Sequence, residues 1–62
     1  MMNQIWHLTA IGVSRYVEGS LQEAIRVAKQ IDREYNRAFG VTITDDEGEV
    51  VATVEDGQVN RL

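Results

Sequence analysis

The sequence predicts a small two-layer α+β domain, in which one long helix packs on one face of an antiparallel sheet. An amphipathic stretch, residues 20–39, stands in the middle of the 62-residue chain, with β-branched or alternating segments on both sides of it. Turn signals built from acids and glycine divide the segment after the helix into strands. The order strand or hairpin, helix, hairpin therefore predicts a sheet with a single covering helix.

The helix is predicted over residues 20–39. Ser20 is a good N-cap, and Glu23 three residues later completes a Ser-x-x-Glu capping box. The apolar residues of this stretch recur at spacings of three and four and fall within an arc of roughly 140°, the width of a core-facing stripe. They are Leu21, Ala24, Ile25, Ala28, Ile31, Tyr35 and Ala38. Gly40 is expected to stop the helix, because a left-handed residue is favoured at that position.

The segment before the helix, residues 4–18, is predicted to form β-structure because it is rich in β-branched and aromatic side chains. Both of its alternating faces are fairly apolar, which predicts a strand covered on both sides. Gly12 allows either a bend in one long strand or a tight turn over residues 11–14 that makes a hairpin. The hairpin is favoured, because a single strand of this length would be unusual.

The segment after the helix is predicted to form a hairpin over residues 41–54. Its first four residues alternate apolar and polar, and the turn at 45–48 ends in a glycine suited to a bulged hairpin. Asp56-Gly57 is a second turn signal, of the two-residue kind, and allows a short last strand over 58–62.

One helix covers one face of a sheet, so the other face is expected to meet water or a partner. That face is predicted to show Thr42, Thr44, Thr53 and part of the Trp6 side of the first strand. A single domain of 62 residues has a thin core, and the absence of cysteine excludes disulfides and the common zinc frameworks. A homodimer that covers the open face is therefore expected.

The composition sets further bounds on function. The net charge is −4, with four of the six basic residues on the helix and six of the ten acids after Gly40, and this overall acidity disfavours nucleic acid as the main partner. No apolar run is long enough for a membrane span, and no signal-peptide pattern is visible, so a cytoplasmic protein without membrane contact is expected.

A basic stripe on the predicted helix is the strongest candidate for a partner-binding surface. It consists of Arg26, Lys29, Arg33 and Arg37, which together span about 80° of the helix. Like charges at this spacing destabilise an isolated helix slightly, which an acidic partner would relieve. Three interpretations stay open: a solvated outer face, which is favoured, a protein contact, and a nucleic-acid contact. Trp6 could anchor an interface or pack in the core.

No catalytic, cofactor-binding or metal-binding residue is predicted. His7 is the only histidine and is expected to be partly buried in a strand, because a triad or zinc site needs further partners. The acids around Asp45 lack the spacing of a calcium loop and are expected to form a solvated turn. Asp32 falls inside the apolar arc, so it lies either at the margin of the stripe, which is favoured, or accepts hydrogen bonds from a strand or a partner.

Two segments carry a resemblance to known proteins: residues 19–25, Gly-Ser-Leu-Gln-Glu-Ala-Ile, and residues 41–48, Val-Thr-Ile-Thr-Asp-Asp-Glu-Gly. Their layout resembles small bacterial and phage proteins of unassigned function, and the strand–helix–strand order is similar to the small domain of Hic-type antitoxins. The acidic proline-containing segment of those antitoxins is absent here, and the resemblance assigns no functional residue. The sequence thus predicts a non-enzymatic interaction module that self-associates; the alternative is an antitoxin-like or nucleic-acid-associated regulator that uses the basic helix face.

Overall fold

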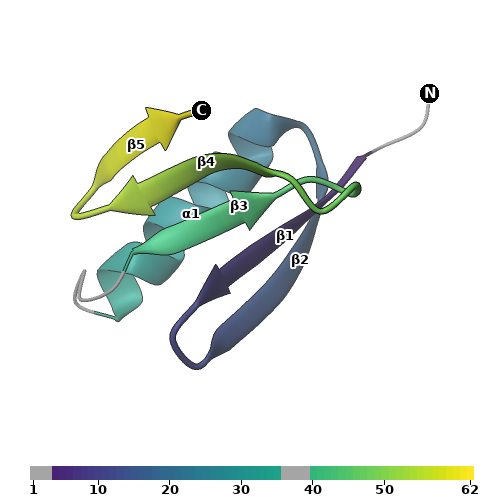
Figure 1. The fold of residues 1–62 in the computed structure, drawn as a ribbon. Coiled ribbons are helices and arrows are strands. Elements are labelled where there is room, and N and C mark those ends of the chain that lie inside the picture. Colours follow the sequence, from purple (N-terminus) through teal and green to yellow (C-terminus); the bar gives the residue numbers. More distant parts are fainter. Residues whose placement is uncertain (1–3, 36–39) are drawn as a thin grey trace.

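One helix packs against one face of a five-stranded antiparallel sheet in the computed structural model, which describes residues 4–35 and 40–62 (Figure 1). The elements are β1 (Gln4–Ala10), β2 (Val13–Gly19), α1 (Leu21–Glu34), β3 (Val41–Thr44), β4 (Val50–Glu55) and β5 (Gln58–Arg61). The predicted α+β class is therefore confirmed. Within the described ranges, no helix has the length and apolar character needed to cross a bilayer.

The strands lie in the order β2-β1-β3-β4-β5, and every neighbouring pair is antiparallel. The N-terminal strand β1 is thus an interior strand, hydrogen-bonded to β2 on one side and to β3 on the other. The helix leaves from β2 and returns to β3, so it crosses over β1 and covers one face of the sheet. In Figure 1 the helix lies behind the strands, and the uncovered face is turned to the reader.

The first two strands form the hairpin that the sequence favoured. Ala10 pairs with Val13, which leaves Ile11 and Gly12 as a two-residue turn. Gly12 has φ +76, in the region that favours glycine. Residues directly opposite each other in an antiparallel pair share a face, so Val13 lies on the same face as Ala10.

The helix begins as predicted but ends earlier. The Ser20 hydroxyl accepts a hydrogen bond from the Glu23 backbone N–H at 3.2 Å, which confirms the N-cap. The last helical residue is Glu34, and Tyr35 leaves helical geometry with φ −102 and ψ 25. The described helix therefore ends before the predicted boundary, because apolar spacing marks a face but not the last helical residue; the rest of the predicted range, 36–39, lies outside the described residues. The stripe residue Ala38 falls in 36–39, outside the described residues.

Two turns shape the C-terminal half. The Asp45 carboxylate accepts hydrogen bonds from the backbone N–H groups of Glu47 and Glu49, each at 2.9 Å, and Gly48 has φ +87. The register shifts beside this turn, between Ile43 and Thr44, which is the predicted bulged hairpin. At the second turn Asp56 and Gly57 have φ 53 and 78, the two positive values of a type I′ hairpin turn, and β5 follows as predicted.

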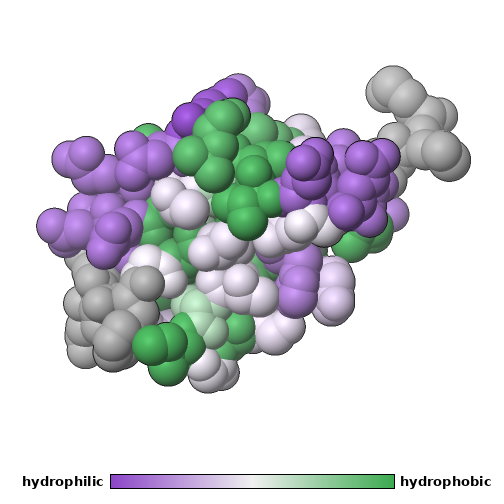
Figure 2. All heavy atoms as spheres, viewed as in Figure 1, coloured by the Kyte–Doolittle hydropathy of each residue, from purple (hydrophilic) through white to green (hydrophobic). Residues whose placement is uncertain are grey.

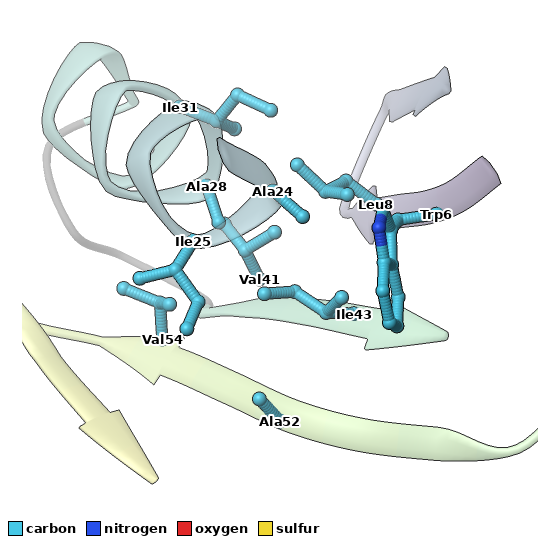
Figure 3. Close-up of a cluster of buried hydrophobic side chains, with 10 residues drawn as sticks. All are labelled: Trp6, Leu8, Ala24, Ile25, Ala28, Ile31, Val41, Ile43, Ala52 and Val54. Atoms are coloured by element: carbon cyan, nitrogen blue, oxygen red, sulfur yellow. The ribbon is translucent and has the colours of Figure 1, made fainter. Parts of the chain in front are cut away.

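The core lies between α1 and the covered face of the sheet (Figure 3). Its buried residues are Trp6, Leu8, Ala24, Ile25, Ala28, Ile31, Val41, Ile43, Ala52 and Val54. Most of the predicted stripe is here, but Tyr35 is 52% exposed because it follows the last helical turn. The prediction that the Trp6 side of the sheet is partly open is also wrong: Trp6 and Leu8 face the helix, and the face that bears Ile5 is open.

Asp32 belongs to this buried layer. Only 4% of its surface is exposed, and one carboxylate oxygen, Oδ2, accepts a hydrogen bond from the Gly57 N–H at 2.8 Å. The favoured placement at the margin of the stripe is therefore wrong; Asp32 accepts a hydrogen bond, as the alternative expected, but the donor lies in the turn between β4 and β5 and not in a strand. The bond joins the C-terminal half of α1 to the β4–β5 turn, 25 residues further along the chain.

Candidate functional site: the open face of the sheet

The open face is the sheet surface that points away from α1. Its members follow from the register, because directly paired residues share a face. They include Ile5, His7, Thr9, Ser14, Tyr16, Thr42, Thr44, Val50, Thr53 and Asn60. The predicted threonines are all among them. Figure 2 views this side and shows weakly polar and hydrophobic residues across its middle, with hydrophilic residues gathered toward the margins.

Three of these residues are more exposed than large apolar side chains usually are. Tyr16 is 68% exposed, Val50 44% and Ile5 41%. The charged residues of the face lie around β1 and β3: Glu18 is opposite Ile5 on β2, Glu55 ends β4, and Asp45 and Asp46 follow β3. The open-face residues of β1 and β3 are therefore uncharged, and this strip could pack against another uncharged surface without desolvating an ion.

His7 is the polar centre of the open face. Its ring stacks on the ring of Tyr16 with centroids 4.4 Å apart and an interplanar angle of 8°. Its Nε2 lies 2.8 Å from the Ser14 hydroxyl oxygen. Both neighbours come from β2, because the hairpin register places Tyr16 opposite His7 and Ser14 opposite Thr9. The ring is half-buried, as the sequence predicted, and it contacts Tyr16 and Ser14.

A serine within hydrogen-bond distance of a histidine is one part of a nucleophilic triad, and the triad also needs an acid that orients the imidazole. In the described part of the chain, His7 has no hydrogen bond to a carboxylate. The same residues contain no group of three or more His, Cys, Asp or Glu side chains placed to hold a metal ion. Among the described residues, the Ser14–His7 pair thus has neither an orienting acid nor a metal-binding group beside it.

A shallow hollow of about 340 Å³ lies where the open face meets the acidic turn. It is lined by Ile5, His7 and Tyr16 from the first hairpin and by Thr44, Asp45 and Asp46 from the second. Sequence reasoning missed this grouping, because nothing in the local pattern specifies that β3 pairs with β1. The Asp45 carboxylate is already engaged by two backbone N–H groups of its own turn, which supports the predicted role of the acids as turn residues.

The basic stripe lies on the other side of the molecule. Arg26, Lys29 and Arg33 are exposed on the surface of α1 that faces away from the sheet, opposite the buried Ala28 and Ile31. Arg26 forms an ion pair with Glu23, at 2.6 Å. Within residues 4–35 and 40–62, Lys29 and Arg33 form no ion pair. The fourth stripe residue, Arg37, lies outside the described residues.

Trp6, the remaining candidate from the sequence, packs in the core. It is 7% exposed, and its indole N–H donates to the Gly19 carbonyl at 2.9 Å. Of the two alternatives left open for this residue, core packing is the one that the structure supports. The exposed aromatic residue of this hairpin is Tyr16, on β2.

Comparison of the chain with protein-family models, with curated proteins and with solved structures gave no match.

Proposed function

We propose that this protein is a non-enzymatic interaction module that self-associates through the open face of its sheet. The main observation behind the proposal is that α1 packs on only one face of the five-stranded sheet. The other face exposes Ile5, Tyr16 and Val50 to solvent. A sheet face that is left uncovered and exposes large apolar side chains favours association.

A second copy is the partner that fits best, for two reasons. The residues of β1 and β3 on this face carry no charge, and the acids Glu18, Glu55, Asp45 and Asp46 lie around them, so a two-fold contact centred on β1 and β3 keeps the acids of the two copies apart. The molecule measures 35 × 20 × 18 Å. Its broad side can therefore supply the roughly 500 Å² per subunit that the smallest specific interfaces bury.

The experiment compares two identical substitutions at different places. Tyr16→Lys introduces a charge on the open face. Tyr35→Lys replaces another exposed tyrosine, at the end of α1, and introduces the same charge there. In sedimentation velocity at about 100 μM we expect a dimer for the parent and for Tyr35→Lys, and a monomer for Tyr16→Lys. Circular dichroism of each variant checks that the fold is retained.

Val50→Lys provides a second test on the same face in case Tyr16→Lys weakens the fold by removing the ring stacked on His7. It should also give a monomer. The proposal is wrong if the parent sediments as a single 7.0 kDa species at about 500 μM, or if Tyr35→Lys disrupts the dimer as much as Tyr16→Lys does.

The second candidate is an antitoxin-like or nucleic-acid-associated regulator that binds through the basic stripe. It is favoured by one observation: Lys29 and Arg33 are exposed and lack an ion pair among the described residues. A two-fold dimer through the open faces leaves both helices on the outside, so this function is compatible with self-association.

Binding to duplex DNA at low salt tests this candidate. Three phosphate contacts predict an affinity that falls about 40-fold between 50 and 200 mM salt. The triple variant R26Q/K29Q/R33Q should lose this binding, while Arg15→Gln, which removes an exposed cation from β2, should keep it. Absence of binding by the parent at about 50 mM salt excludes the candidate.

A further inference from the structure

The sheet has two edges, and they differ in what they offer to another strand. β2 ends the strand order on one side and β5 ends it on the other (Figure 1). β5 has four residues, and a very short edge strand is one way in which proteins prevent pairing with other chains. β2 has seven residues, pairs with β1 without a register shift and contains no proline. The β2 edge is therefore the longer and more regular of the two.

Alternate residues of β2 direct their backbone groups away from β1. Ala10 and Val13 flank a two-residue turn, so these two residues exchange backbone hydrogen bonds with each other. Hydrogen-bonded and non-hydrogen-bonded pairs alternate along an antiparallel ladder, which leaves the N–H and C=O groups of Ser14, Tyr16 and Glu18 pointing outward. Within the described residues, these groups form no other backbone hydrogen bond. β2 thus presents a row of free donors and acceptors with the spacing that an added strand requires.

The side chains of β2 place one charge of each sign beside this edge. Arg15 is exposed and lies on the covered face, because it is paired with Leu8. Glu18 is exposed and lies on the open face, opposite Ile5. Neither Arg15 nor Glu18 forms an ion pair with a described residue. A strand that adds here gains two cross-strand ion pairs if it carries an acid opposite Arg15 and a base opposite Glu18.

A second copy of β2 does not meet this requirement. Two β2 strands that pair antiparallel through their outer edges keep both helices on the same side of the joined sheet. Each residue then lies opposite a residue from the same face of the other copy. Because Arg15 and Glu18 lie on opposite faces, no register of this kind pairs them, and the register centred on Arg15 brings two like charges together. The charges of this edge are therefore suited to a different chain.

We propose that the β2 edge binds an extended segment of a partner protein, which adds antiparallel as a sixth strand of the sheet. The backbone of this segment pairs with Ser14, Tyr16 and Glu18. Its side chains place an acid opposite Arg15, a base opposite Glu18 and apolar groups opposite the two valines of β2. This binding uses the edge of the sheet, so it does not depend on self-association through the open face.

The probe is the capped peptide Lys-Val-Thr-Glu-Thr-Val, in which the lysine is placed opposite Glu18 and the glutamate opposite Arg15. In an NMR titration of the ¹⁵N-labelled protein we expect saturable shifts of the Ser14, Tyr16 and Glu18 amide signals. The peptide with its lysine and glutamate exchanged has the same composition, and it should bind about tenfold more weakly because both ion pairs become like-charge contacts. The variant R15E/E18R should reverse this preference.

N-methylation of the peptide backbone tests the strand geometry with the parent protein alone. A methyl group on the first threonine blocks an N–H that points at Tyr16 and should abolish binding. A methyl group on the glutamate blocks an N–H that points away from β2 and should leave binding unchanged. Equal binding of the two methylated peptides, or of the two charge orders, overturns the proposal, as does the absence of saturable shifts up to about 10 mM peptide.

Hydrogen exchange of the free protein distinguishes an open edge from one that is already occupied. The Ser14, Tyr16 and Glu18 amides should exchange rapidly without peptide and slowly at saturating peptide. Slow exchange of these amides in the free protein would mean that a second copy already pairs with the edge, and this result would also overturn the proposal.

Discussion

Asp32 illustrates, at the scale of single residues, what sequence patterns can and cannot specify. The spacing of the helix places this residue inside the apolar arc, and the structure buries it there. Its partner, the Gly57 N–H, lies in a turn 25 residues away, and no local pattern indicates that contact. Periodicity therefore placed Asp32 in the apolar arc but did not decide between margin and core, because the hydrogen bond that makes burial tolerable depends on the order of the strands.

Ser20 provides the first residue-scale prediction. Ser20→Ala removes the hydroxyl that accepts the Glu23 N–H, so it should destabilise the protein by about 1 kcal/mol. Urea denaturation measures the change, with Gln22→Ala on the exposed first turn as a control that leaves the cap intact. An unchanged midpoint for Ser20→Ala would mean that the first-turn amides do not depend on this hydroxyl.

Ile31 and Ile11 form a matched pair for the second prediction. Ile31 is fully buried between helix and sheet, so Ile31→Ala should cost about 2–5 kcal/mol, a large share of the stability of a small domain. Ile11, in the first hairpin turn, is 67% exposed, and the same substitution there should change stability by no more than about 0.5 kcal/mol. Similar losses at both positions, measured by thermal unfolding, would contradict the assignment of the core.

At the scale of elements, the first hairpin depends on the backbone of Gly12. An added Cβ would meet no atom within 4 Å, so the effect of a substitution comes from the positive φ alone. Gly12→Ala should cost about 1–2 kcal/mol, and Gly12→Asn less, because asparagine tolerates this conformation better. Chemical denaturation ranks the two variants, and alanine as stable as the parent would show that the turn does not need a left-handed residue.

The elements themselves were largely predictable, and their arrangement was not. The capping box, the alternating segments and the Asp56-Gly57 turn are local signals, and each marks an element that the structure contains. The order of the strands rests on the pairing of β1 with β3 across the helix, for which the sequence has no local signal. The contacts of His7 with Tyr16 and Ser14, and the hollow beside Asp46, depend on this register, so the candidate surface could be predicted only as an open face with threonines.

At the scale of the whole molecule, the proposed self-association has a consequence for thermal unfolding. A dimer that unfolds directly to two separate chains is stabilised by mass action, and its midpoint should rise by about 5 °C for each tenfold increase in concentration. Differential scanning calorimetry over two decades of concentration measures this dependence. Tyr16→Lys should remove it, and a midpoint independent of concentration for the parent would argue for a stable monomer.

The interior position of β1 also affects how the chain is made. During synthesis β1 and β2 leave the ribosome first, but the second neighbour of β1 is β3, which emerges only after the whole of α1. Until then one edge of β1 has unpaired backbone groups beside the apolar side chains of Trp6 and Leu8, the kind of edge that recruits other chains. A nascent or truncated chain that stops before Val41 is therefore expected to be a target for chaperones and proteases, whereas the finished chain covers this edge with its own third strand.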